Sequence, residues 1–302
     1  MWEHEIIEYK NFLKLERSLS DNSVSAYVND INKLTSFLKS ENKESIKCSD
    51  VDSKIIREFV EYIYNLGISS YSQARIISGI KSFFNYLLIE DKIKLNPTQL
   101  IESPKLDKKL PDTLNLEDIE NILSSIEMNS FEGVRNRAIV ETLYSCGLRV
   151  SELINLSFQN LYLDIGFIKV IGKASKERLV PIGSSAIKYI NIYNENYRKT
   201  MKVKTGNEGF LFLNRRGSKI SRNMIFIIIK KIAQKLNLGK NISPHTFRHS
   251  FATHMIEGGA DLRAVQEMLG HESITTTEIY THLNKEYLRE VVKKYHLSLI
   301  HI

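Results

Sequence analysis

The stretch from Asn96 to Pro111 constrains the fold most strongly, because it holds three of the five prolines in a chain of 302 residues. Its central sequence, Ser-Pro-Lys-Leu-Asp-Lys-Lys-Leu-Pro, breaks the helical pattern that precedes it. A chain of this length is too long for one ordinary core and long enough for two. We therefore predict two domains, residues 1–101 and 112–302, joined by a linker over residues 102–111.

The first hundred residues show only helical periodicity. Apolar side chains recur at helical spacing over residues 3–16, 23–38, 51–66 and 70–89, and Gly67 follows the third of these segments. Four helices with short connections predict a compact bundle.

The second domain combines helices with a β-hairpin. Asn115 is a candidate N-cap for a helix to about residue 126, and Gly147 suits the end of a helix that begins near Val134. Residues 167–171 and 177–182 have the pattern of paired strands. Further helices are predicted at 184–199, 221–236, 244–257, 261–269, 274–280 and 285–294. The expected fold class is mainly α, with an α+β second domain that has a small sheet.

The basic charge is concentrated in the second domain. Residues 1–104 carry 13 lysines and arginines against 15 acidic residues, whereas residues 105–302 carry 29 against 20. This bias makes a polyanion such as DNA a plausible partner, although a solvated basic surface is the commoner meaning.

The sequence predicts a cytoplasmic protein. Glu3, Glu5 and Glu8 interrupt any N-terminal leader pattern, and the most apolar stretch, residues 224–229, is too short to cross a bilayer. The two cysteines, Cys48 and Cys146, fall in different predicted domains, which fits a reducing compartment.

A phosphate site is predicted at the start of the helix over residues 244–257. Ser243 is a candidate N-cap, Pro244 fits the first helical position, and His245 and Arg248 share one face. A helix N-terminus favours anions, and arginine can direct two donors at phosphate oxygens. Taken alone, His245 also fits a capping or packed histidine.

A zinc site is the weaker interpretation of the same histidines. His245 and His249 have ligand-like spacing, but no glutamate stands between them as a general base and no cysteine pair lies nearby. Arg248 would also repel a dication. We predict no metal.

Tyr280 is the candidate nucleophile, because it follows His271 by nine residues and lies downstream of the phosphate site. A phenol needs cationic neighbours and a proton acceptor to attack at neutral pH. With 14 tyrosines in the chain, an ordinary tyrosine is the alternative.

These motifs follow one another in a familiar order. His245-x-x-Arg248, Leu269-Gly-His271 and Thr276-Thr-x-x-Tyr280 come after a Gly-Leu-Arg149 motif and an Ile-Gly-Lys173 motif that leads to Leu-Val-Pro181. In content and order they resemble the tyrosine recombinases (phage integrase family), and within them the Xer branch, the XerD type more than the XerC type. The resemblance covers nearly the whole chain, including the bundle and the linker.

The resemblance implies a role for each motif. Arg149 and Arg248 would clamp the scissile phosphate, and Glu152 would orient Arg149 or its loop, a surface carboxylate being the alternative. No metal, cofactor or ATP would be required.

The same resemblance assigns the remaining catalytic groups. Lys173 would protonate the leaving 5′ oxygen, His245 would act as acid and base, and His271 would hydrogen-bond the phosphate. Tyr280 would attack in line to form a 3′-phosphotyrosyl bond.

DNA contacts are implied in both domains. An N-terminal core-binding bundle of the SAM-like type and the catalytic domain would close around duplex DNA. The candidate contacts are Arg75, Lys81, Lys92 and Lys94 on or near the fourth helix, and Lys105, Lys108 and Lys109 in the linker. A merely solvated linker is the alternative.

The implied activity is site-specific recombination, acting in chromosome dimer resolution. An integrase of a phage or mobile element is the alternative within the same chemistry, and a catalytically inert DNA-binding protein is the alternative from another class. The implied partners are a dif-like DNA site, a tetramer with itself or a paralogous XerC-like recombinase, and an FtsK-type DNA translocase, with no membrane. The C-terminal segment, with the apolar tail 297–302, would dock on a neighbouring protomer, unless it packs on its own domain.

Overall fold

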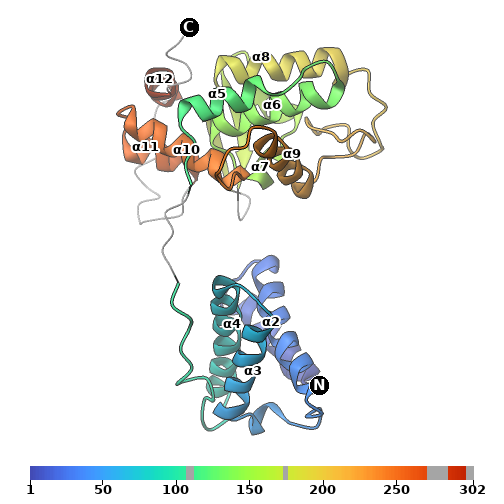
Figure 1. Ribbon diagram of the computed structural model, residues 1–302, viewed down its shortest axis with the longest axis vertical. Coiled ribbons are helices and arrows are strands. Elements are labelled where there is room, and N and C mark those ends of the chain that lie inside the picture. Colours follow the sequence, from blue (N-terminus) through green and yellow to red (C-terminus); the bar gives the residue numbers. More distant parts are fainter. Residues whose placement is uncertain (107–111, 173–175, 271–284, 297–302) are drawn as a thin grey trace. The chain divides into compact units, whose positions relative to one another are not determined.

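The computed structural model describes residues 1–106, 112–172, 176–270 and 285–296 (Figure 1). The chain divides into two compact units, residues 1–109 and 110–302, and each unit has its own hydrophobic core. The first unit is helical, and the second adds a three-stranded sheet to its helices. The predicted fold class is therefore confirmed.

Four α-helices build the N-terminal unit. They are α1 (Glu3–Leu15), α2 (Asp21–Ser40), α3 (Ser53–Asn65) and α4 (Ser70–Ile89). Ser20 and Asp52 cap α2 and α3, because each side chain accepts a free N–H of the first turn. Tyr9, Phe83 and Phe84 are fully buried where the helices meet. Helical periodicity and caps are thus sufficient to account for this unit.

An ion pair between a buried carboxylate and a half-exposed arginine joins α2 to α4. The carboxylate of Asp30 is 1% exposed and accepts hydrogen bonds from Nη1 and Nη2 of Arg75, at 2.7 and 2.6 Å. Lys33 also contacts Asp30, at 3.4 Å. Gly79 makes room for the carboxylate, because a Cβ at that position would lie 2.5 Å from Asp30 Oδ2.

Helix α6 (Phe131–Cys146) forms the centre of the C-terminal unit and is buried along nearly its whole length. The helices that pack on it are α5 (Leu116–Ser124), α7 (Val150–Ile154), α8 (Ser184–Tyr193) and α10 (Pro244–Glu257). Helix α10 in turn contacts α9 (Arg222–Lys235), α11 (Leu262–Leu269) and α12 (Lys285–Tyr295) (Figure 1). The sheet has the order β1-β2-β3, with β1 (Leu161–Tyr162), β2 (Phe167–Ile171) and β3 (Glu177–Pro181) antiparallel.

The structure differs from the sequence prediction at three places in this unit. Helix α7 and the two-residue strand β1 were not expected, because neither is long enough to show a period. The helix predicted over 184–199 ends as an α-helix at Tyr193 and continues as a π-helical turn, Asn194–Arg198. The helix predicted over 274–280 lies outside the described residues.

Helix α12 packs on its own unit. Val291 and Val292 are each 3% exposed and belong to the C-terminal core, where α12 meets α10 and β3. The sequence left open whether the C-terminal segment docks on a neighbouring protomer or packs on its own domain, and α12 packs on its own domain. The tail 297–302 lies outside the described residues. Across the described ranges, no helix has both the length and the apolar character needed to cross a membrane.

Candidate active site

Arg149 is positioned by the sharp end of α6. Gly147 ends that helix with φ 57°, and Arg149 then becomes the N-cap of α7. A side chain at Gly147 would be strained and would also lie 2.5 Å from the Phe251 ring. The Arg149 guanidinium donates to Glu152 Oε1 and to the carbonyl of Gly270, both at 2.9 Å, and its side chain is 35% exposed. It is therefore fixed by the protein and still accessible.

Arg248 approaches the same place from α10. Ser243 and Pro244 begin this helix as predicted, and Arg248 lies in its second turn. Its Nη1 donates to the carbonyl of Gly147 at 2.8 Å, and its Nη2 donates to the carbonyl of Leu269 at 2.5 Å. Burial, together with the charge of Arg149, lowers the Arg248 pKa to about 10, so the group stays cationic at neutral pH.

His245 lies one turn before Arg248 on α10, and its side chain is exposed. It is therefore not a packed core histidine. His249 is exposed as well, whereas His254 is buried and hydrogen-bonded through Nδ1 to the Tyr144 hydroxyl at 2.9 Å. Within the described ranges, no group of three or more histidine, cysteine or acidic side chains could hold a metal ion.

Glu152 is the carboxylate around which the arginines gather. It is 3% exposed, so the surface-carboxylate alternative does not hold. It accepts bonds from Arg149 and from both Nη atoms of Arg178, at 2.9 and 3.0 Å, and lies 3.9 Å from Arg248 Nη1. Burial would raise its pKa, but the hydrogen bonds and charges of Arg178 and Arg149 outweigh burial and lower it. Three guanidinium groups thus surround one ionised carboxylate, which leaves a net charge of +2.

The C-terminal end of α11 completes the cluster. The carbonyls of Met268, Leu269 and Gly270 accept hydrogen bonds from Arg178, Arg248 and Arg149, in that order. These carbonyls have no partner inside the helix and carry the negative end of its dipole, so cations stabilise them. The arginines consequently fix the point where α11 ends, immediately before His271.

Three of the predicted catalytic residues, Lys173, His271 and Tyr280, lie outside the described residues. The structure does describe the glycines that precede two of them. Gly172 follows β2 and donates its N–H to the carbonyl of Lys176 at 2.8 Å, and Gly270 caps α11 with φ 63°.

Comparisons with known proteins agree along the chain. Residues 6–91 match the N-terminal SAM-like domain of phage integrases, and residues 112–287 match the phage integrase family. The tyrosine recombinase XerD of Staphylococcus aureus (strain Mu50) is 43% identical over 291 residues, which cover 96% of this chain and 98% of that protein. The chain belongs to the phage integrase family. It is a site-specific tyrosine recombinase of the Xer branch, an enzyme that exchanges DNA strands, as the sequence predicted.

Solved structures share the fold of this tyrosine recombinase. XerH site-specific recombinase bound to a palindromic difH substrate is 25% identical, with a TM-score of 0.68, over 96% of this chain and 85% of that chain. The Tn1549 transposon integrase in complex with circular intermediate DNA is 21% identical, with a TM-score of 0.70, over 95% of this chain and 98% of that chain. The second likeness concerns the fold alone.

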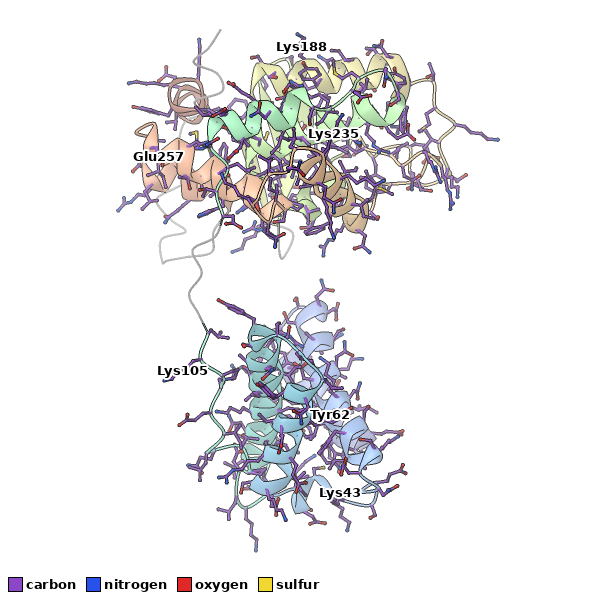
Figure 2. All side chains as sticks on the ribbon, in the orientation of Figure 1. Lys43, Tyr62, Lys105, Lys188, Lys235 and Glu257 are labelled. Carbon is purple, nitrogen blue, oxygen red and sulfur yellow. The ribbon has the colours of Figure 1, made fainter. Side chains whose placement is uncertain are left out.

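The side chains predicted to contact DNA differ in their exposure and in whether they already form ion pairs within the protein. Arg75 is held by Asp30, and Lys92 is bonded to Glu8, so the charges of both are partly neutralised. Lys81 is half-buried, whereas Lys94 and Lys105 are exposed, the latter on the segment that follows α4 (Figure 2). Lys108 and Lys109 lie outside the described residues.

Arg178 is the residue of the recombinase site that sequence analysis missed. Strand register offers a signal that could have found it, because Arg178 pairs with Val170 and shares its strand face with Val180. Both valines are buried. A charged residue at an inward position of a strand indicates a buried partner, which here is Glu152.

Proposed function

We propose that this recombinase cuts and rejoins duplex DNA through a 3′-phosphotyrosyl bond to Tyr280, and that it resolves chromosome dimers in the cytoplasm as an Xer-type enzyme. The observation that supports the proposal most directly is the placement of Arg149 and Arg248 around Glu152. An accessible guanidinium lies beside a buried one, in a cluster with an excess of two positive charges.

Such a cluster suits phosphoryl transfer. Each Nη atom carries two hydrogens, and the hydrogen bonds that Arg149 and Arg248 make within the described part of the chain use one per atom, so donors are left for phosphate oxygens. Negative charge on phosphorus oxygens rises in the pentacoordinate transition state. Fixed cations therefore stabilise that state more than the bound substrate.

The remaining groups complete the proton balance. The Tyr280 oxygen attacks phosphorus while the bond to the 5′ oxygen breaks, His245 accepts the phenol proton, and Lys173 gives a proton to the 5′ oxygen. His271 hydrogen-bonds a non-bridging oxygen. The phosphotyrosyl bond keeps the energy of the diester, so a 5′ hydroxyl can reverse the steps and rejoin a strand without ATP.

The proposed DNA target is a dif-like site, since the related XerH recombinase is bound to difH in its solved structure. Two such sites would be held by a tetramer of this chain with itself or with a paralogous XerC-like recombinase. The tail 297–302 would dock on a neighbouring protomer, and an FtsK-type translocase would activate the assembly. Phosphate contacts would make DNA affinity fall steeply with salt.

The test begins with a duplex chosen from random sequences by repeated binding to the full chain. A nick beside the cleavage position makes the released fragment, which ends in the 5′ hydroxyl, short enough to diffuse away. Strands then cannot be rejoined, so covalent protein–DNA complexes accumulate and can be quantified on a denaturing gel. Tyr280→Phe should bind this duplex and give no covalent complex. The exposed tyrosine of the Tyr64→Phe control lies on α3, and this variant should react like the unmodified chain.

Each outcome bears on one part of the proposal. Trapping by Tyr280→Phe would refute the nucleophile, and binding without trapping by the unmodified chain would favour an inert DNA-binding protein. The selected sequence separates a chromosomal role from a mobile-element role, according to whether it occurs near the replication terminus or at the ends of an element.

A further inference from the structure

Among the three clustered arginines, Arg178 makes hydrogen bonds with the most nitrogens of its guanidinium group within the described residues. Its Nε donates to the carbonyl of Met268 at 2.7 Å, and Nη1 and Nη2 donate to the two oxygens of Glu152 at 2.9 and 3.0 Å. Its side chain is 13% exposed, between the 9% of Arg248 and the 35% of Arg149, and all three nitrogens of its guanidinium donate to protein groups. Arg178 is therefore placed to hold protein groups rather than substrate.

One guanidinium lies against the two glycines that precede Lys173 and His271. A Cβ at Gly172 would lie 3.7 Å from Arg178 Nη1 and 3.9 Å from Glu152 Oε1. A Cβ at Gly270 would lie 3.0 Å from the same Nη1. The distances at Gly172 are those of ordinary van der Waals contact, and the space at Gly270 is tighter, so a shift of the guanidinium would change the packing beside both glycines.

We propose that Arg178 is a positioning residue for catalysis, which fixes Gly172 and Gly270 against Glu152 and thereby sets where the segments of Lys173 and His271 begin. This inference rests on the catalytic roles proposed above for Lys173 and His271. In this arrangement one side chain on β3 joins α7, through Glu152, to the end of α11, through Met268, and lies beside Gly172 of its own hairpin.

The planar fork of arginine, and not only its charge, is required for this role. A lysine at position 178 would keep the positive charge next to Glu152 but could not bond both carboxylate oxygens and the Met268 carbonyl in one fixed geometry. Arg178→Lys therefore separates position from charge, and Arg178→Gln removes both. Displacing a catalytic group by about 1 Å can slow a reaction by about 100-fold, so we expect losses of that order from either variant.

The experiment compares two nicked substrates with the selected sequence, one with the normal 5′ oxygen and one with sulfur in its place. A sulfur leaving group departs without a proton, so it bypasses the role of Lys173. Both Arg178 variants should cleave the normal substrate about 100-fold more slowly than the unmodified chain, and about 10-fold more slowly with sulfur, because only the His271 part of the displacement still matters. Their gel-shift affinity should change less than about threefold, since the phosphate clamp is retained.

The matched control is Lys188→Gln, which removes one positive charge from the exposed side of α8 (Figure 2). It should cleave both substrates at the unmodified rate. Arg178→Lys cleaving the normal substrate at the unmodified rate would overturn the inference, and so would an equal loss on the two substrates, which indicates general damage to the fold. Failure of the unmodified chain to form a covalent complex would instead refute the proposed function on which the inference rests.

Discussion

Arg149 and Glu152 bond each other twice, because the backbone N–H of Arg149 donates to Oε2 at 2.8 Å and its Nη1 donates to Oε1 at 2.9 Å. The first bond satisfies a free N–H at the start of α7. The second fixes the guanidinium that faces solvent. A single carboxylate therefore both starts a helix and orients a group of the proposed phosphate clamp.

Glu152→Gln should destabilise the C-terminal unit by roughly 3 kcal/mol, because the clustered arginines lose their buried counter-charge. Urea unfolding followed by circular dichroism measures this, and fluorescence of Trp2, the single tryptophan, reports separately on the N-terminal unit. The control Glu195→Gln breaks an exposed pair with Lys199 and should change stability by less than about 1 kcal/mol.

The effect of Glu152 should also depend on pH. Its pKa is lowered in the folded protein, so its contribution is fully present above the unfolded-state value of about 4.3 and is lost as pH falls through the folded value. The stability gap between the unmodified chain and Glu152→Gln should therefore narrow below about pH 4. A gap that stays constant down to pH 3 would contradict the assignment.

Arg75→Gln should destabilise the N-terminal unit by roughly 2 kcal/mol, because Asp30 then stays buried with only Lys33 beside it. This estimate is kept low because half of the Arg75 side chain is exposed. Trp2 fluorescence during urea unfolding is the measurement, and Arg17→Gln, an exposed arginine on the connection after α1, is the control.

A double variant tests whether the two residues act as a pair. Adding Asp30→Asn to Arg75→Gln should cost less than the sum of the single changes, with a coupling of about 1 kcal/mol. Strict additivity would mean that Arg75 does not stabilise Asp30. Arg75 would then be better explained as a DNA contact alone.

Local patterns were sufficient to predict the elements that carry long periods or clear caps. The bundle helices, the Ser243-Pro244 start of α10 and the Gly147 stop of α6 all follow from side-chain spacing and backbone preference. The contacts of Arg178 could not be predicted in this way, because Met268 lies 90 residues further along the chain. Only the inward register of Arg178 on β3 hints at a partner, and the register does not say which one.

The short elements α7 and β1 could not be predicted for a different reason. Helix α7 has five residues and β1 has two, so neither repeats its period. Yet α7 carries Glu152, and its start places Arg149. The sequence therefore named Arg149, Glu152 and Arg248 as candidates but did not predict how they are held, since the end of α11, which accepts bonds from both arginines, lies more than 100 residues after Arg149.

The C-terminal unit should lose stability in mild acid because of His296. This ring is 1% exposed and packs on Tyr144 and Phe251, with centroid distances of 4.9 and 5.5 Å. Burial lowers its pKa to about 4. The unfolded chain therefore binds a proton near pH 6.5, whereas the folded chain binds it only near pH 4. The free energy of unfolding falls by up to roughly 3 kcal/mol as pH falls from about 6.5 to 4.

Replacing the His296 ring should make the stability of the C-terminal unit depend less on pH. His296→Leu is expected to lose less stability between pH 7 and pH 5 than the unmodified chain, as measured by urea midpoints from circular dichroism. His254, whose pKa burial also lowers, adds a slope of the same sign. His249→Gln changes an exposed ring and should keep the unmodified slope. An unchanged slope in His296→Leu would exclude His296 as its source.

Deleting residues 297–302 should separate assembly from folding. A longer deletion from residue 284 would also remove Val291 and Val292, which are each 3% exposed in the core, and each buried valine is worth about 2 kcal/mol. The short deletion leaves both valines and His296 in place, so the urea midpoint and the affinity for a single selected site should not change. If the apolar tail docks on a neighbouring protomer, sedimentation of the protein with two-site DNA should show fewer tetramers, and recombination between the sites should slow. Unchanged tetramers and an unchanged recombination rate would show that protomers are joined without the tail.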